Sequence, residues 1–200
     1  MLFRASCAAI AAALMLGAVP AAAQQFSDSY EFLEAIRKAD GAKVNKYLQD
    51  KGLRIVNTRD RESGEGAIHI VTRREDLLYL RVVLQQDEVN VNLQDRRGNT
   101  ALLLAADRGW SEGVDTLVKY GANVNLPNAA GETPLIRAVQ AHDERVVAAL
   151  LKAGADPDRA DFLTGKSARD YARDNARYPG VVKLLNDAPK AAKGAAGPRL

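Results

Sequence analysis

The chain has 200 residues, of which 47% are hydrophobic and 26% are charged, and its formal net charge is +3 at pH 7. A chain of this length can bury a hydrophobic core, and so small a positive charge argues against general binding to nucleic acid. We therefore expect a chain that folds around its own core and acts on a partner other than nucleic acid.

Residues 1–23 have the composition of a secretory signal sequence. Arg4 gives a positive start, residues 8–19 form an apolar run, and residues 21–23 are alanines that precede Gln24. This order is typical of a signal that is cleaved after small residues, and the run is too short to cross a bilayer. An uncleaved amphipathic or core helix is the alternative, but the run has no polar face. We predict cleavage before Gln24.

The single cysteine, Cys7, lies inside this predicted signal and lacks the sequence that precedes a lipoprotein cysteine, so we expect no lipid anchor. The predicted mature chain has no cysteine and cannot rely on disulfides. Its net charge is +2, because Arg4 is the only charged residue removed.

The first predicted pair of helices follows from Ser27. Its first helix carries the apolar residues Phe32, Leu33, Ala35 and Ile36, and Ser27, Asp28 or Ser29 could cap its start. A break at Asp40 and Gly41 separates it from a second helix that reaches Gly52.

A second predicted pair lies between about residues 59 and 92. The run Gly64-Glu65-Gly66-Ala67-Ile68-His69 opens its first helix, and Leu80, Val83 and Leu84 fill its second. Gly66 stands where the next two units have a threonine, so the capping hydroxyl is missing and we expect a looser turn. Asp87 and Glu88 stand where later units have Gly-Ala, so this helix should end without a glycine.

Residues 95–125 and 128–158 repeat each other at an offset of 33 residues. The identical pairs include Gly98 and Gly131, Thr100 and Thr133, Leu102 and Leu135, Ala105 and Ala138, Leu117 and Leu150, and Gly121 and Gly154.

Each unit has the signals of two short helices. The threonines should cap the first helix, and Pro134 fits its first position. In the third unit Gly109 should end the first helix, and the second should run from about Ser111 to Tyr120. Gly121 supplies the left-handed residue that closes it.

A fifth pair begins near Asp161. Gly165, Lys166, Ser167 and Ala168 match the fourth unit with one residue added, and Ser167 can act as the cap. Arg169, Asp170, Arg173 and Asp174 make its first helix polar, as suits a terminal unit. Residues 188–200 are rich in Ala, Gly, Pro and Lys, and we predict a disordered tail.

These units resemble the ankyrin repeat, whose period is 33 residues. The resemblance covers about residues 27–187 and is strongest in residues 95–158. It implies an all-α ankyrin solenoid of about five helix-turn-helix repeats with hairpin-like fingers. We therefore predict a signal peptide at 1–23, an ankyrin domain at 27–187 and a disordered tail at 188–200.

The sequence offers little for catalysis or for holding a cofactor or metal. His69 is expected to form structural hydrogen bonds between repeats, and His142 falls in a turn where solvation is expected. Gly165-Lys166-Ser167 ends like a phosphate loop, but residue 160 is alanine instead of the first glycine. Asp156, Asp158 and Asp161 lack the glycine and glutamate of a calcium loop, so we expect a solvated loop tip.

A protein-binding surface is the remaining candidate site. Ankyrin repeats usually bind partners on the concave face formed by the fingers and the first helices. Eight candidate positions follow from that resemblance: Arg73, Arg74, Arg96, Arg97, Asn99, Arg108, Glu132 and Gln140. Trp110, the only tryptophan, is a ninth candidate because it lies at the turn between helices. Arginine suits carboxylates and is favoured at interfaces. Four acids share the face, however, so a mutually satisfied salt-bridge lattice is an equal alternative.

Two apolar features also have two interpretations. Trp110 could anchor a partner at the rim, but packing on the helix of the next repeat is favoured. Phe162 and Leu163 could form an exposed apolar tip, but we expect them to seal the junction between the fourth and fifth repeats.

We predict a non-catalytic, monomeric protein-interaction scaffold in the periplasm, with no cofactor, no nucleic acid and no membrane association after signal cleavage. A secreted effector that binds a host protein is the alternative, and the protein would then be extracellular. An enzyme would need chemistry from arginines and carboxylates alone.

Overall fold

The computed structural model describes residues 21–50, 55–175 and 177–189. The predicted signal up to residue 20 and the predicted tail from residue 190 lie outside the described residues. The described part forms ten α-helices and one 3-10 helix, without a strand. The helices are α1 (Ala21–Lys38), α2 (Gly41–Gln49), α3 (Ala67–Arg73), α4 (Leu77–Leu84), α5 (Ala101–Asp107), α6 (Ser111–Lys119), α7 (Pro134–Gln140), α8 (Glu144–Lys152), α9 (Ala168–Asp174) and α10 (Pro179–Asp187), with the 3-10 helix η1 (Ile55–Asn57) between α2 and α3.

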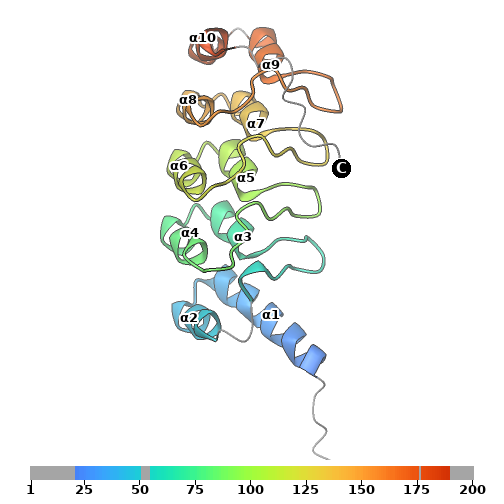
Figure 1. Ribbon diagram of the computed structural model, residues 1–200, viewed down its shortest axis with the longest axis vertical. Coiled ribbons are helices and arrows are strands. Elements are labelled where there is room, and N and C mark those ends of the chain that lie inside the picture. The colour runs from blue at the N-terminus through green and yellow to red at the C-terminus, as the bar shows by residue number, and fades with distance from the viewer. Residues whose placement is uncertain (1–20, 51–54, 176, 190–200) are drawn as a thin grey trace, which may run out of the picture.

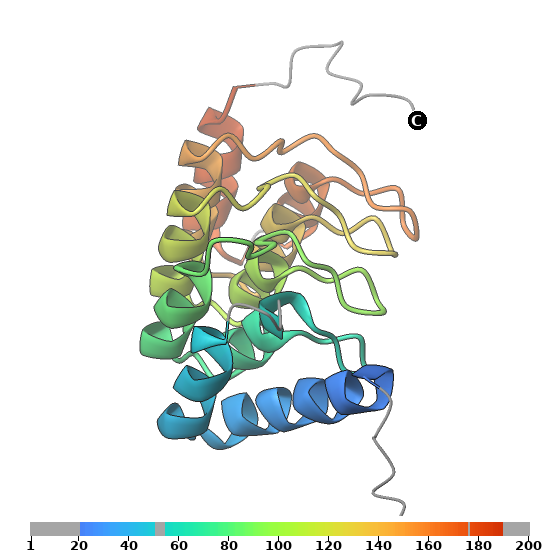
Figure 2. The ribbon, with the colours of Figure 1, turned by 60° about the horizontal axis from the view of Figure 1, so that its bottom comes forward.

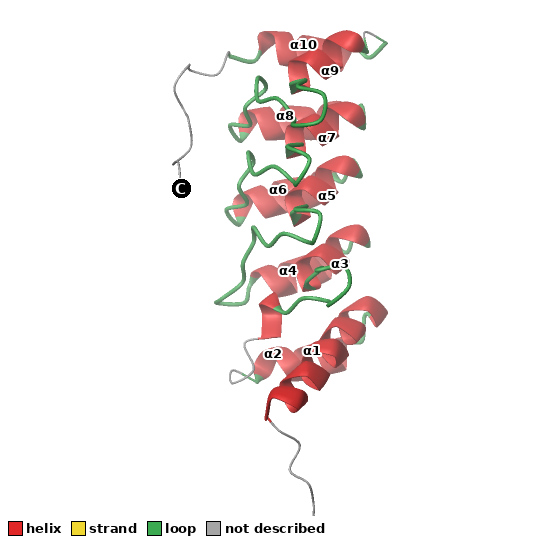
Figure 3. Ribbon diagram, turned by 90° about the vertical axis from the view of Figure 1, so that its right-hand side faces the viewer, coloured by secondary structure: helices red, strands yellow, loops and turns green. Residues whose placement is uncertain are grey.

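The helices form five antiparallel pairs that stack in chain order (Figure 1). One column contains α1, α3, α5, α7 and α9, and the other contains α2, α4, α6, α8 and α10. Long loops project from the first column to one side, and each loop lies next to the loop of the following repeat (Figure 2). The side view shows the same pairs one above another (Figure 3). The predicted all-α solenoid of five helix-turn-helix repeats with fingers is therefore confirmed.

The core runs through the stack as one continuous cluster. Leu102, Leu117, Leu135 and Leu150 have no exposed surface and occupy equivalent places in the third and fourth repeats. Small residues such as Ala105 let neighbouring helices approach. Burying a leucine contributes about 1.5–3 kcal/mol, so most of the stability comes from burial within and between neighbouring repeats.

The predicted caps of the later repeats are present. The Oγ1 atoms of Thr100 and Thr133 each accept a hydrogen bond from the backbone N–H three residues on, at 3.2 Å. Ser167 accepts in the same way from Asp170 at 3.3 Å. Pro134 is the first residue of α7, as predicted. Gly121 has the expected positive φ of 84°.

The start of the first helix differs from the prediction. Ser27, Asp28 and Ser29 do not cap it, because α1 begins at Ala21 and all three lie within it. The predicted break is present, since Asp40 caps α2. The second helix ends at Gln49, and Gly52 lies outside the described residues.

The fingers are held by a feature that the sequence analysis missed. Asp60, Asp95, Asn128 and Asp161 occupy the same place in successive fingers. One side-chain oxygen of each accepts two backbone N–H bonds from residues two to four positions further on. Asp161 is only 5% exposed, so the predicted solvated loop tip is wrong for this residue. Each finger therefore closes on a local turn before it meets its neighbour.

Candidate partner-binding surface

His69 and Gly66 fix the geometry between the second and third repeats. The Gly66 N–H donates to His69 Nδ1 at 3.1 Å, and His69 Nε2 lies 3.0 Å from the carbonyl oxygen of Asn99. The predicted structural role of His69 is confirmed. The predicted absence of a capping hydroxyl is confirmed, because no side chain at Gly66 caps α3, and the imidazole accepts from the Gly66 N–H instead. The expected looser turn stays a prediction. A Cβ at Gly66 would lie 2.6 Å from Leu93 Cδ2 and 3.0 Å from the Thr58 carbonyl oxygen, so a threonine there would require Leu93 to move.

Burial determines the charge state of this histidine. The ring is completely buried, and desolvation lowers the pKa of His69 below its usual 6.5. The hydrogen bond to the Asn99 carbonyl opposes this shift but does not overcome it. Because Nδ1 accepts from Gly66, Nε2 carries the proton and donates to Asn99. Only this neutral tautomer satisfies both bonds.

Three of the predicted binding arginines lie where the inner helices end, and all three are engaged. Arg73 pairs with Glu65. Arg74 donates to the Ile36 carbonyl at 2.6 Å and pairs with Asp76 at 3.0 Å. Arg108 pairs with Glu75, with 2.9 Å between Nε and Oε1. For Arg73, Arg74 and Arg108 the salt-bridge interpretation therefore describes the structure.

Arg137, which the sequence analysis did not select, organises the centre of the concave face. Its guanidinium bridges Asp107 at 2.6 Å and Glu132 at 3.2 Å, and it also donates to Gln140 at 3.3 Å. Predicted site residues Glu132 and Gln140 are thus tied to one cation between the third and fourth repeats. Arg137 is only partly exposed, and its Nε is buried without a hydrogen-bond partner.

Asn99 also has a structural role. Its amide nitrogen donates to Asp95 at 3.0 Å, and its side-chain oxygen accepts from Asn128 at 3.2 Å. This chain of bonds connects the third finger to the fourth. We conclude that Asn99, Glu132 and Gln140 shape the face and offer few free polar atoms.

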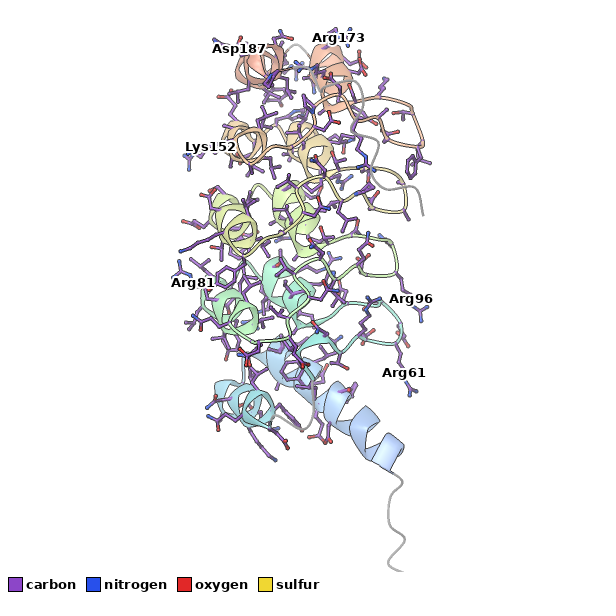
Figure 4. All side chains as sticks on the ribbon, viewed as in Figure 1. Arg61, Arg81, Arg96, Lys152, Arg173 and Asp187 are labelled. Atoms are coloured by element: carbon purple, nitrogen blue, oxygen red, sulfur yellow. The ribbon has the colours of Figure 1, made fainter. Side chains whose placement is uncertain are left out.

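Arg96 and Arg97 differ from the other arginines. Both are exposed and lie at the tip of the third finger, next to the second finger. The Arg96 guanidinium donates to the carbonyl of Arg61. Arg97 has no side-chain hydrogen bond or ion pair within the described part of the chain. Figure 4 shows Arg61 and Arg96 pointing outward from the finger tips, away from the helices. Neither Arg96 nor Arg97 has an acidic partner in that part of the chain.

Trp110 does not belong to the exposed surface. Its side chain is 7% exposed and forms part of the core. A Cβ added at Gly113 would lie 2.0 Å from the indole ring, so the ring rests directly on that glycine of α6. The expected burial of Trp110 is confirmed, but the ring rests on Gly113 of α6 in its own repeat and not on the helix of the next repeat as predicted. Trp110 is therefore removed from the candidate surface.

Phe162 and Leu163, in contrast to Trp110, are exposed. They are 69% and 79% exposed at the tip of the fifth finger, so the expectation that they seal a repeat junction is wrong. The finger closes instead through Asp161, which accepts bonds from Tyr171 and Thr164. Burial works against its ionisation, but these bonds outweigh it and lower the pKa of Asp161. The hydrogen bonds to the ionised carboxylate hold the Asp161 side chain inside the finger, and Phe162 and Leu163 remain exposed at its tip.

His142 also departs from the expectation of a solvated residue. It has a φ of 58° in the turn between α7 and α8. Its ring stacks on Tyr178 with 3.7 Å between centroids, and Nε2 lies 3.3 Å from Asn175 Nδ2. His142 therefore joins the fourth repeat to the fifth and stays separate from His69.

No metal-binding group is formed by the residues that the structure describes. Among those same residues, none of the helices is long and apolar enough to cross a membrane.

These features define a helical repeat protein with a rigid, polar concave face and exposed finger tips. The family model described as ankyrin repeats, in three copies, matches residues 22–128 and 68–161. The chain belongs to the ankyrin-repeat family, whose fold is typically a non-catalytic interaction module.

Two curated proteins contain similar segments. The chain is 34% identical over 131 residues to human BCL-6 corepressor-like protein 1, covering 64% of this chain and 7% of that protein. It is 32% identical over 100 residues to the E3 ubiquitin-protein ligase KEG of Arabidopsis thaliana, covering 49% of this chain and 6% of the ligase. The chain thus spans a small fraction of each relative, and the match to the ligase lies in its ankyrin region.

Proposed function

We propose that this protein is a non-catalytic, monomeric scaffold in the periplasm that holds another protein on its concave face and finger tips. Membership of the ankyrin family supports the class of function. Export is supported by residues 1–23, and the cysteine-free remainder needs no disulfide to fold after export.

The observation that carries the proposal is the contrast between the two groups of arginines. Arg73, Arg74 and Arg108 are held in ion pairs, whereas Arg96 and Arg97 stand exposed on fingers that are fixed by backbone bonds. Holding a surface rigid before binding lowers the ordering cost of association. Exposed arginines on such a surface can form bidentate bonds with carboxylates of a partner.

Affinity capture tests this proposal. The purified chain is immobilised, and periplasmic extract is passed over it at moderate salt. One comparison variant carries Arg96→Glu with Arg97→Glu. The matched control carries Arg81→Glu with Lys152→Glu, which reverses two exposed charges on the outer helices (Figure 4). Circular dichroism confirms that all three forms are equally helical.

We expect one protein to be retained by the unchanged chain and by the outer-helix control, and to be lost from the finger variant. Equal retention by all three forms would show that the finger arginines are not the site. If nothing is retained from the periplasm, the periplasmic scaffold is refuted. Culture supernatant and host proteins would then test the secreted alternative.

A further inference from the structure

Three neighbouring fingers form a continuous row at their tips. We call Arg96, Arg97, Ala129, Ala130, Phe162 and Leu163 the finger-tip row. The Ala129 N–H donates to the Arg97 carbonyl at 2.9 Å, and the Phe162 N–H donates to the Ala130 carbonyl at 2.9 Å. The spacing of the row is therefore set by backbone hydrogen bonds between fingers.

The two ends of the row differ in chemistry. The third finger presents the exposed guanidinium groups of Arg96 and Arg97 beside the second finger. The fifth finger presents Phe162 and Leu163, which are 69% and 79% exposed. Ala129 and Ala130 lie between these ends, and their small side chains leave room for another chain to approach the backbone.

Phe162 is held at the tip by its neighbour. A Cβ at Gly131 would meet the Phe162 backbone nitrogen at 2.5 Å and the ring at 2.6 Å. The ring therefore lies against the glycine of the fourth finger while 69% of the residue remains exposed. Adjacent exposed Phe and Leu side chains on a fixed loop are a common mark of a protein-binding site.

The backbone bonds also set the distance between the cationic and apolar ends. Residues that share a backbone hydrogen bond between two chain segments lie about 5 Å apart, and consecutive Cα atoms are about 3.8 Å apart. Arg97 and Phe162 are thus within about 15 Å of each other. An extended peptide covers that distance in about four residues, whereas a helix needs about ten residues.

We propose that the finger-tip row binds an extended segment of the partner protein, in which a carboxylate stands about four residues from a large apolar side chain. The carboxylate pairs with Arg96 or Arg97, the apolar side chain packs on Phe162 and Leu163, and the intervening backbone crosses the two alanines. This inference rests on the proposed scaffold function and specifies the chemistry of its partner.

Selection from a displayed library of random peptides on the purified chain tests the inference. Each peptide has about twelve residues, which accommodates both the spacing of about four residues in an extended peptide and the spacing of about ten in a helix. Selections run in parallel on the unchanged chain, on Arg96→Glu with Arg97→Glu, and on Phe162→Ser with Leu163→Ser. The outer-helix controls are Arg81→Glu with Lys152→Glu for charge and Leu78→Ser for exposed apolar surface, because Leu78 is 70% exposed on α4.

We expect peptides enriched on the unchanged chain to carry Asp or Glu and a large apolar residue at a separation of about four. The arginine variant should reverse the charge preference, and the Phe162 and Leu163 variant should abolish the apolar preference. Each should bind the selected peptide at least about tenfold more weakly. Both outer-helix controls should give the same peptides as the unchanged chain.

Enrichment without an acidic preference, a spacing of about ten residues typical of a helix, or no enrichment at all would overturn the inference. So would preferences that the finger variants leave unchanged. Any of these outcomes would refute the proposed peptide specificity without refuting the proposed scaffold function. A partner captured from extract and lost from the Arg96 and Arg97 variant would still support the scaffold, even if the library selects no such peptide.

Discussion

Lowering the pH from about 7 to 5.5 should destabilise the contact between the second and third repeats through His69. The folded state holds this ring neutral, and burial lowers its pKa below the value of 6.5 that applies in the unfolded chain. The unfolded state therefore binds more protons, so the stabilising effect is fully present above pH 6.5 and is lost as the pH falls toward the folded pKa.

The size of the change in the free energy of unfolding follows from the titration of His69 alone. One proton taken up by the unfolded state changes the free energy of unfolding by up to about 1.4 kcal/mol per pH unit. Between pH 7 and 5.5 the loss can be no larger than about 1.3 kcal/mol, and most carboxylates do not titrate in that range. Protonation would also place a hydrogen on Nδ1, which accepts from Gly66, and so would break one of the two bonds.

Urea unfolding at both pH values measures the effect. Circular dichroism reports the whole stack, and fluorescence reports the third repeat, since Trp110 is the only tryptophan. His69→Gln should remove the pH dependence between 7 and 5.5 because the amide does not titrate there. His142→Gln is the matched control and should keep it. Unchanged pH dependence in the His69→Gln variant would refute this reasoning.

Three further predictions test other parts of the account. Thr133→Ala should lower the free energy of unfolding by about 1 kcal/mol through loss of a cap, with Thr133→Ser restoring most of it in the same urea assay. Gly98→Ala should lower the free energy of unfolding more than Gly121→Ala does. Both glycines have positive φ, but only at Gly98 would a Cβ meet a backbone nitrogen, at 2.6 Å. Equal losses in the two variants would contradict this. Mass spectrometry of the exported protein should find Gln24 at the N-terminus, and an intact residue 1 would exclude cleavage.

Much of the fold could be predicted because it is encoded by local signals that recur. The offset of 33 residues identified the third and fourth repeats, and Thr100 and Thr133 marked the helix starts. These signals act within a few residues of their own position, so their structural consequence does not depend on the rest of the chain. The first helix was less predictable because Ser27 has capping chemistry but lies inside a longer helix.

The site could be predicted only in part, because it depends on contacts between repeats. Sequence register placed Arg73 and Arg97 on one face. It could not tell that Arg73 has a glutamate partner and that Arg97 has no ion-pair partner among the described residues. Arg137 was missed because its role arises from two acids on different fingers and helices. The prediction that Phe162 is buried was wrong. Its apolar character favours burial, but hydrogen bonds to the ionised Asp161 carboxylate fix the finger so that its tip points outward.

The most direct test of the central claim is photo-crosslinking in living cells. A photoreactive amino acid replaces Ala129, at the middle of the finger-tip row, or Arg81, on outer helix α4. The account predicts that illumination joins one partner protein to the chain at Ala129 and not at Arg81, and that Arg96→Glu with Arg97→Glu abolishes the adduct. Adducts at Arg81 alone, or at neither position, would contradict a scaffold that holds its partner on the fingers.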